Sequence, residues 1–241
     1  MLGYVAFFAI ASGPWLAAAG QQDANPQSPV TRRVAAAQQR VAAQPKSPQA
    51  YNELAFAYCR WARDTGDVKL YDSADNALQR SFQLSPANYE AQKLEVTVLL
   101  GRRDFAKALK LATELNHKVP DDIAGWGLVV DSRLALGNEK EAERAAQWIL
   151  DLRPGSSLGF VKAAEVREQI GDLEGAIQFY EEAARRTAQT DFDERAWLLN
   201  QQARLVLKSG NAKRAEELFG QALKLFPDSQ SVRTNLALLH R

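Results

Sequence analysis

The chain has 241 residues, of which 46% are hydrophobic and 24% are charged, a balance typical of a folded protein with a substantial core. Its 30 Lys and Arg residues nearly match its 29 Asp and Glu residues, so no net positive field favours nucleic acid or an anionic membrane surface. The single cysteine, Cys59, excludes an intramolecular disulfide and is expected to be a small buried hydrophobic residue.

The first twenty residues have the pattern of an export signal. Residues 1–20 contain no charged side chain, and their apolar run ends in small residues. Such an end suits cleavage by signal peptidase near Ala19 or Gly20, which would place the mature chain in a bacterial periplasm or outside the cell. The alternative is an uncleaved membrane anchor, although a Gly-Pro pair interrupts the run. Contact with a membrane is expected only in that second case.

Residues 21–47 are predicted to form a polar linker followed by one leading helix. Gln21 to Pro29 is polar and loop-like, whereas Val30 to Ala43 has the pattern of a helix. A stack of helical repeats exposes its core at both ends, so a helix before the first repeat is expected to cover one of them.

From residue 48 onward, small and helix-ending residues recur with a regular period. Alanines lie 34 residues apart and once 39 apart; a proline follows four of them by twelve residues, and a glycine precedes three of them by five. Glycine suits the left-handed end of a first helix, alanine a close helix–helix contact, and proline the end of a second helix. The alanines are Ala74, Ala108, Ala142, Ala176 and Ala215, the prolines Pro86, Pro120, Pro154 and Pro227, and the glycines Gly137, Gly171 and Gly210.

This pattern resembles the tetratricopeptide repeat, a 34-residue unit of two helices. The resemblance implies an all-α, right-handed superhelical solenoid of about five units over residues 48–241. The units are expected near 48–88, 89–122, 123–156, 157–194 and 195–229, with a capping helix in 230–241. The second unit departs most from the family pattern, because Glu95 stands where a leucine is expected.

Two insertions interrupt the period. The first unit has seven more residues between Ala55 and Ala74 than the fifth unit has between its corresponding alanines, which predicts one extra turn in each of its helices. Five further residues are inserted around Thr187 to Asp193. There, Asp191 or Asp193 is expected to cap a helix that begins near Arg195.

Catalytic motifs are nearly absent. Gly155 to Gly159 matches the G-x-S-x-G pattern of hydrolases, but it follows a proline between two helices instead of a strand, so Ser156 or Ser157 is predicted to be a helix N-cap. The chain has two histidines and one cysteine, none of them at metal-ligand spacing, and no glycine-rich phosphate loop. We therefore expect no enzyme activity, no metal and no small-molecule cofactor.

The resemblance places a binding groove on the first helix of each unit, whose inward face repeats at positions i, i+3 and i+7. Asn200 and Arg204 are predicted to grip a partner's backbone or carboxylate, because core packing requires neither of them. Alternatively, Arg204 pairs with Glu165 or Glu168 of the preceding unit and joins two repeats. The candidate groove residues are Asn52, Phe56, Lys93, Asp131, Glu165, Trp197, Asn200 and Arg204.

In function, the resemblance implies a non-catalytic scaffold that binds a peptide segment or partner protein, and the export signal predicts that it works in an envelope or secreted assembly. The alternative is a holdase or co-chaperone that captures extended or unfolded client segments. Tight binding of one folded partner favours the first interpretation, and suppressed aggregation of many clients favours the second.

Overall fold

The computed structural model describes residues 29–240, and the predicted export signal lies outside this range. None of the helices in this range is both long and apolar enough to cross a membrane. The described residues form twelve helices: α1 (Pro29–Ala43), α2 (Pro48–Thr65), α3 (Leu70–Leu84), α4 (Tyr89–Gly101), α5 (Phe105–Lys118), α6 (Ile123–Ala135), α7 (Glu139–Leu152), α8 (Ser157–Gln169), α9 (Leu173–Arg186), α10 (Phe192–Lys208), α11 (Ala212–Leu225) and α12 (Gln230–Leu239).

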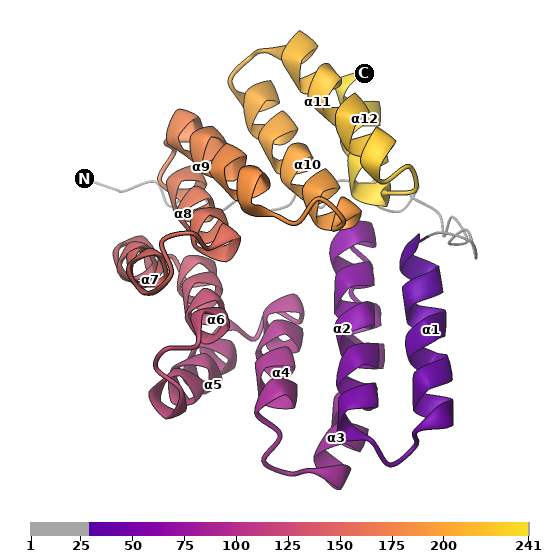
Figure 1. Ribbon diagram of the computed structural model, residues 1–241. Helices are drawn as coiled ribbons and strands as arrows, with labels where there is room; N and C mark the ends of the chain where they lie inside the picture. Colours follow the sequence, from indigo (N-terminus) through magenta and orange to yellow (C-terminus); the bar gives the residue numbers. More distant parts are fainter. Residues whose placement is uncertain (1–28, 241) are drawn as a thin grey trace.

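The helices form consecutive hairpins, from α2/α3 to α10/α11, with α1 before the first hairpin and α12 after the last (Figure 1). Each first helix packs against its own second helix, and α2, α4, α6 and α8 also pack against one another in succession, whereas α10 contacts α9 of the preceding unit. This arrangement confirms the predicted all-α solenoid with a leading helix and a capping helix.

The repeated alanines and glycines have the structural roles that their spacing predicts. Ala74, Ala108, Ala142, Ala176 and Ala215 are all fully buried where two helices meet. Gly137, Gly171 and Gly210 have φ angles of 74°, 87° and 89°, in the left-handed region that favours glycine. In the second unit, the matching position holds Arg103, which adopts a φ angle of 64° without being glycine.

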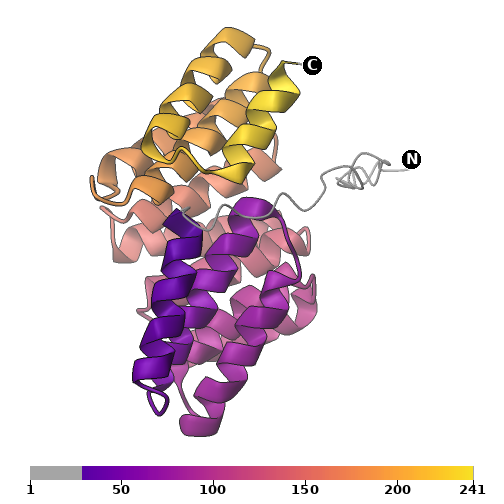
Figure 2. The same ribbon diagram turned by 90° about the vertical axis from the view of Figure 1, so that its right-hand side faces the viewer.

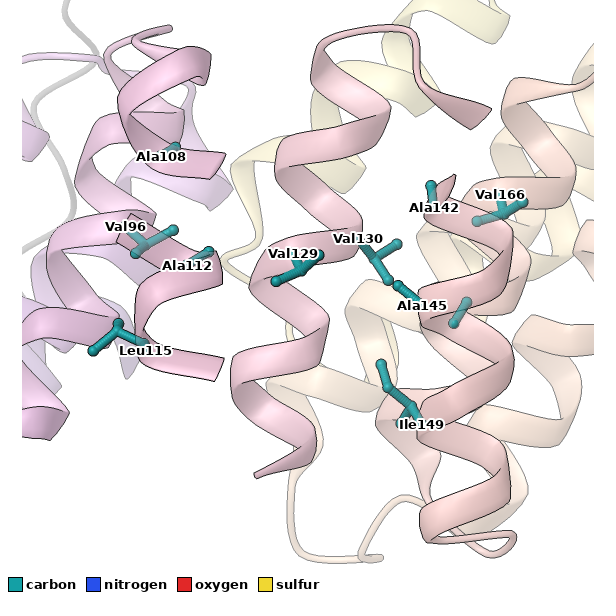
Figure 3. Packing of buried hydrophobic residues seen from close by; sticks show 11 residues of the cluster. Val96, Ala108, Ala112, Leu115, Val129, Val130, Ala142, Ala145, Ile149 and Val166 are labelled. Atoms are coloured by element: carbon teal, nitrogen blue, oxygen red, sulfur yellow. The ribbon is translucent and has the colours of Figure 1, made fainter. Parts of the chain in front are cut away.

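The core continues from one unit to the next. Val96 of the second unit, Val129 and Val130 of the third and Val166 of the fourth belong to one buried cluster (Figure 3). Because neighbouring hairpins share this cluster, each unit buries its apolar face against the next.

The expectation of one extra turn in each helix of the first unit is wrong. Helix α2 has 18 residues and α3 has 15, compared with 13 and 14 in the third unit, so most of the added length lies in α2. Gly66, with a φ angle of 74°, ends α2 after its added turn. The fifth unit is also extended: α10 begins at Phe192 instead of near Arg195, and Asp191 is its N-cap.

The extended ends of α2 and α10 bring the first and last units together. The C-terminal end of α2 meets the N-terminal ends of α10 and α12, so the array curves back on itself (Figures 1 and 2). Arg60 pairs with Asp193 and Glu194, and Arg63 pairs with Glu194 at 2.9 Å. Apolar contact accompanies these ion pairs: Val30 of α1 belongs to the buried cluster of the last unit. We call this contact between the two end units the seam.

Candidate functional site

The first helices α2, α4, α6 and α8 line a groove with a volume of about 1090 Å³. These helices follow one another along the curved array (Figure 1). Apolar side chains reach the groove from every one of these helices: Phe56, Leu94, Leu128 and Leu158. Polar side chains surround them, and most of these make contacts that join one unit to the next.

Asn52 and Phe56 are groove residues of α2. The amide of Asn52 accepts a hydrogen bond from Ser81 at 2.7 Å and donates one to Asn88, the N-cap of α4, at 3.3 Å. Asn52 therefore fixes α2 to the next unit. Phe56, by contrast, is 50% exposed, and its ring lies beneath the guanidinium of Arg60 at 5.6 Å.

Lys93 lines the groove from α4 and joins this helix to the start of α6. Its ammonium group donates to Asp122, the N-cap of α6, at 3.0 Å, and Tyr89 donates to the same carboxylate at 2.8 Å. Burial acts to raise the pKa of Asp122, but the hydrogen bonds from Lys93 and Tyr89 outweigh it and hold that pKa below its usual value. The carboxylate therefore stays charged and paired.

Asp131 and Glu165 belong to a charged triad centred on Lys162. The buried Lys162 lies 2.5 Å from Asp131 of α6 and 2.8 Å from Glu165 of its own helix, α8. Burial raises the pKa of Glu165 to about 7; the negative charge of Asp131 acts in the same direction, and Lys162 opposes both. Asp131 and Lys162 line the groove, whereas Glu165 lies behind them and is not part of its lining.

Trp197, Asn200 and Arg204 of α10 lie outside the groove, which corrects their prediction as groove residues. Asn200 is 2% exposed and accepts a hydrogen bond from Asn235 of α12 at 2.9 Å. Arg204 donates to both oxygens of Glu168, at 2.8 and 2.7 Å. This is the pairing between repeats that the sequence left open as an alternative. Asn200 therefore joins the last unit to α12, and Arg204 joins the last two units.

Trp197 lies at the seam. Its ring meets Tyr180 edge-on at 6.1 Å, and the guanidinium of Arg63 lies 4.8 Å from its centre. Arg63 also lines the groove, so it occupies the boundary between the groove and the last unit.

Comparison with known proteins agrees with this geometry. Residues 158–228 match the family model described as tetratricopeptide repeat. A thermophilic tetratricopeptide-repeat protein of Thermus thermophilus is similar in structure, with a TM-score of 0.68 and 17% identity over 80% of this chain and 98% of that one. A tetratricopeptide-repeat protein of Parabacteroides merdae gives a TM-score of 0.67 and 14% identity over 88% of this chain and 78% of that one. The chain has the tetratricopeptide-repeat fold.

Other comparisons extend this result. The Cut9–Hcn1 hetero-tetramer of the APC/C contains a chain similar to this tetratricopeptide-repeat array, with a TM-score of 0.65 and 15% identity over 88% of this chain and 40% of that one. No curated protein sequence matches the chain.

The residues that sequence analysis considered for chemistry have structural roles in this tetratricopeptide-repeat array. Ser156 is the N-cap of α8 and accepts a hydrogen bond from the backbone of Gly159 at 3.3 Å. Cys59 is buried in the core of the first unit, and burial raises the pKa of its thiol to about 12. Within residues 29–240, no group of His, Cys, Asp and Glu side chains is arranged to hold a metal ion.

Leu94, Leu128 and Leu158 are apolar groove residues that were not among the candidate site residues. Apolar side chains on a first helix are ordinarily assigned to the core, and the selection therefore favoured polar residues. The repeat itself carried a usable signal, because Leu94 and Leu128 occupy the same position of successive units, 34 residues apart. Both line the groove.

Proposed function

We propose that this protein is a non-catalytic scaffold that binds a segment of a partner protein in the groove formed by α2, α4, α6 and α8. The observation that carries this proposal is the groove itself. Its volume of about 1090 Å³ is large enough for several side chains of a partner. Its apolar residues come from the first helices of four successive units. Among them, Phe56 is half exposed although it is a large aromatic residue.

A protein-binding role also agrees with what is known of a structure of similar fold. Cut9–Hcn1 is a hetero-tetramer and therefore an assembly of two kinds of chain. The similarity covers only 40% of the Cut9–Hcn1 chain, so the partner of the present chain has to be inferred from the groove of the present chain.

The proposal is tested by blocking the groove at Gly127, a buried glycine of α6. In Gly127→Leu the new side chain displaces Leu158 and Lys162, which lie 3.5 Å from the Cβ position, so the groove changes shape and partners recovered by the wild-type chain from an extract of the source cell are expected to be lost. Gly220→Leu is the matched control, because this glycine of α11 has open space around it. Equal recovery of partners by all three proteins would contradict a role for the groove.

A holdase or co-chaperone is the second candidate, and the apolar lining of the groove is the observation that favours it. A holdase acts on many unfolded clients, so the purified chain would suppress the heat-induced aggregation of several unrelated proteins, and Gly127→Leu would suppress it less. Recovery of one folded partner, without any effect on aggregation, supports the scaffold.

We further propose that the scaffold works in an envelope or secreted assembly. The support is the uncharged apolar run of residues 1–20 and its small-residue end. N-terminal sequencing of the protein recovered from expressing cells is expected to begin near Gly20 or Gln21. Intact Met1 in a membrane fraction would support an anchor instead.

A further inference from the structure

The charged residues of the groove are balanced and already paired. Its lining contains three acids and three bases, and each has an ion-pair partner within the chain. The pairs are Glu53 with Arg40, Arg63 with Glu194, Lys93 with Glu90 and Asp122, and Lys162 with Asp131 and Glu165.

These ion pairs determine which chemical class of partner gains binding free energy by entering the groove. A carboxylate of a partner could approach Lys93 or Lys162 only by competing with acids that already hold these ammonium groups at 3.0 Å or less. A cationic partner would likewise compete with the lysines for Asp131 or Glu90. Displacing the pair of Lys93 with Asp122 or that of Lys162 with Asp131 leaves one member without a counter-charge in a partly buried site, so a charged partner has little to gain there.

The apolar residues of the groove remain available for contact. Leu94, Leu128 and Leu158 are only partly buried, and Phe56 is exposed. Gly127 lies against two of the groove side chains: a Cβ atom at this position would lie 3.5 Å from Leu158 and Lys162, in ordinary van der Waals contact. The space at this buried glycine is therefore about the size of one methyl group, and the apolar surface offered to a partner is that of Phe56 and the three leucines.

We infer that the groove selects an uncharged segment bearing bulky apolar side chains, which pack against Phe56 and the three leucines. This inference rests on the proposed scaffold function and specifies the chemistry of its partner. Apolar contact supplies the affinity, because removing apolar surface from water is favourable whether or not the groove has a net charge. The paired charges on both sides act by rejecting charged segments.

The test uses four fluorescent peptides of equal length in a titration with the purified chain. The first has leucines separated by serines. The second and third keep these leucines but carry glutamates or lysines in place of the serines, and the fourth has serine in place of every leucine. The all-neutral leucine peptide is expected to bind at least about tenfold more tightly than each of the others, a difference of about 1.4 kcal/mol. Its affinity is expected to be nearly unchanged between about 0.05 M and 0.5 M salt, because screening acts on charges.

Two variants locate the binding in the groove. Gly127→Leu is expected to weaken binding of the neutral leucine peptide, whereas Gly220→Leu is not. Phe56→Ser is the second variant; its side chain is half exposed, so the fold does not depend on it, and it is also expected to weaken binding.

Other outcomes separate the inference from the function on which it rests. Tighter binding of the acidic or basic peptide, or a steep fall of affinity with salt, overturns the inference and leaves the scaffold function standing. The same holds if no peptide binds while Gly127→Leu still loses the natural partner. If Gly127→Leu and Phe56→Ser retain both the peptide and the natural partner, the inference and the groove function both fail.

Discussion

Arg103 occupies a backbone conformation for which the other units use glycine. Its φ angle of 64° lies in the left-handed region, close to the 74° of Gly137 at the matching position of the next unit. For a residue with a Cβ atom, this conformation costs about 1–2 kcal/mol, and glycine largely avoids that cost. The second unit thus tolerates a strain at its first turn that its neighbours do not have.

Replacing Arg103 with glycine is expected to stabilise the protein. Arg103→Gly should raise the free energy of unfolding by about 0.5–1 kcal/mol, since relief of the backbone strain exceeds the added flexibility of the unfolded chain. Denaturant titration measures the change, and Gly137→Arg should move the midpoint in the opposite direction. A lower midpoint for Arg103→Gly would show that the arginine side chain contributes more than its backbone conformation costs.

Glu165 links stability to pH. Its pKa is about 7 in the folded protein, above the ordinary value of 4.5, so the folded state holds this proton more tightly than the unfolded state does. The contribution of Glu165 is therefore most favourable below 4.5 and is lost as the pH rises through about 7. Glu165→Gln keeps an oxygen acceptor for Lys162 and cannot ionise.

At pH 8, Glu165→Gln is expected to be more stable than the wild type by about 1 kcal/mol, which corresponds to less than one unit of pKa shift. Its stability should also vary less with pH between pH 5 and pH 8. Urea titrations over this range decide the matter, and a variant that is less stable at pH 8 would show that the negative charge of Glu165 holds Lys162 in place.

At the scale of helices, the repeated alanines set how closely each hairpin packs. Ala142 and Ala176 are fully buried at the start of α7 and α9. A leucine at either position must displace its neighbours, and such overpacking costs about 1–3 kcal/mol. Ala142→Leu and Ala176→Leu are each expected to lower the denaturation midpoint, whereas Ala106→Leu, at an exposed position of α5, should leave it nearly unchanged. Equal midpoints for all three would contradict the helix register.

The sequence was sufficient to predict the helices and their pairing but not the lengths of the longer ones. Alanine, glycine and proline have local physical effects, so their spacing identifies each hairpin directly. The distribution of the seven added residues between α2 and α3 depends instead on where the chain can end α2. Gly66 provides that point: α2 ends at Thr65, and Gly66 is its C-cap.

The sequence predicted which face of the first helices forms the groove, but not how the charged residues of the groove are paired. The i, i+3, i+7 pattern identified Phe56, Lys93 and Asp131, which line the groove, but it could not show that the two charged residues are already paired. Their partners lie about one repeat away: Asp122 is 29 residues from Lys93, and Asp131 is 31 residues from Lys162. Arg204 and Glu168 are 36 residues apart. Only the stacking of units brings such residues together.

At the scale of the whole molecule, Asp64 fastens the last helix to the first unit. Its carboxylate accepts hydrogen bonds from the hydroxyls of Ser229 and Ser231, at 2.7 and 3.1 Å, and from the backbone of Gln230 at 3.2 Å. These groups lie at the N-terminus of α12, where backbone N–H groups have no partner within the helix. Asp64 therefore acts as a cap supplied by another part of the chain.

Asp64→Ala is expected to loosen α12 at a cost of about 0.5–2 kcal/mol, the range measured for the loss of a helix cap. Hydrogen exchange should show faster exchange in α12, and the thermal midpoint should fall. Asp67→Ala is the control, because Asp67 contacts only the turn before α3 in the described structure. Unchanged exchange in α12 would mean that the apolar part of the seam holds this helix without Asp64.

The seam changes how the array can come apart. In a linear array of repeats each unit touches only its neighbours, so terminal units can detach one at a time. Here, detaching the first hairpin would also break its ion pairs with α10 and expose the cluster that Val30 shares with the last unit. Within residues 29–240, detaching the first or the last unit thus also costs the contacts of the seam, which a linear array of repeats does not have.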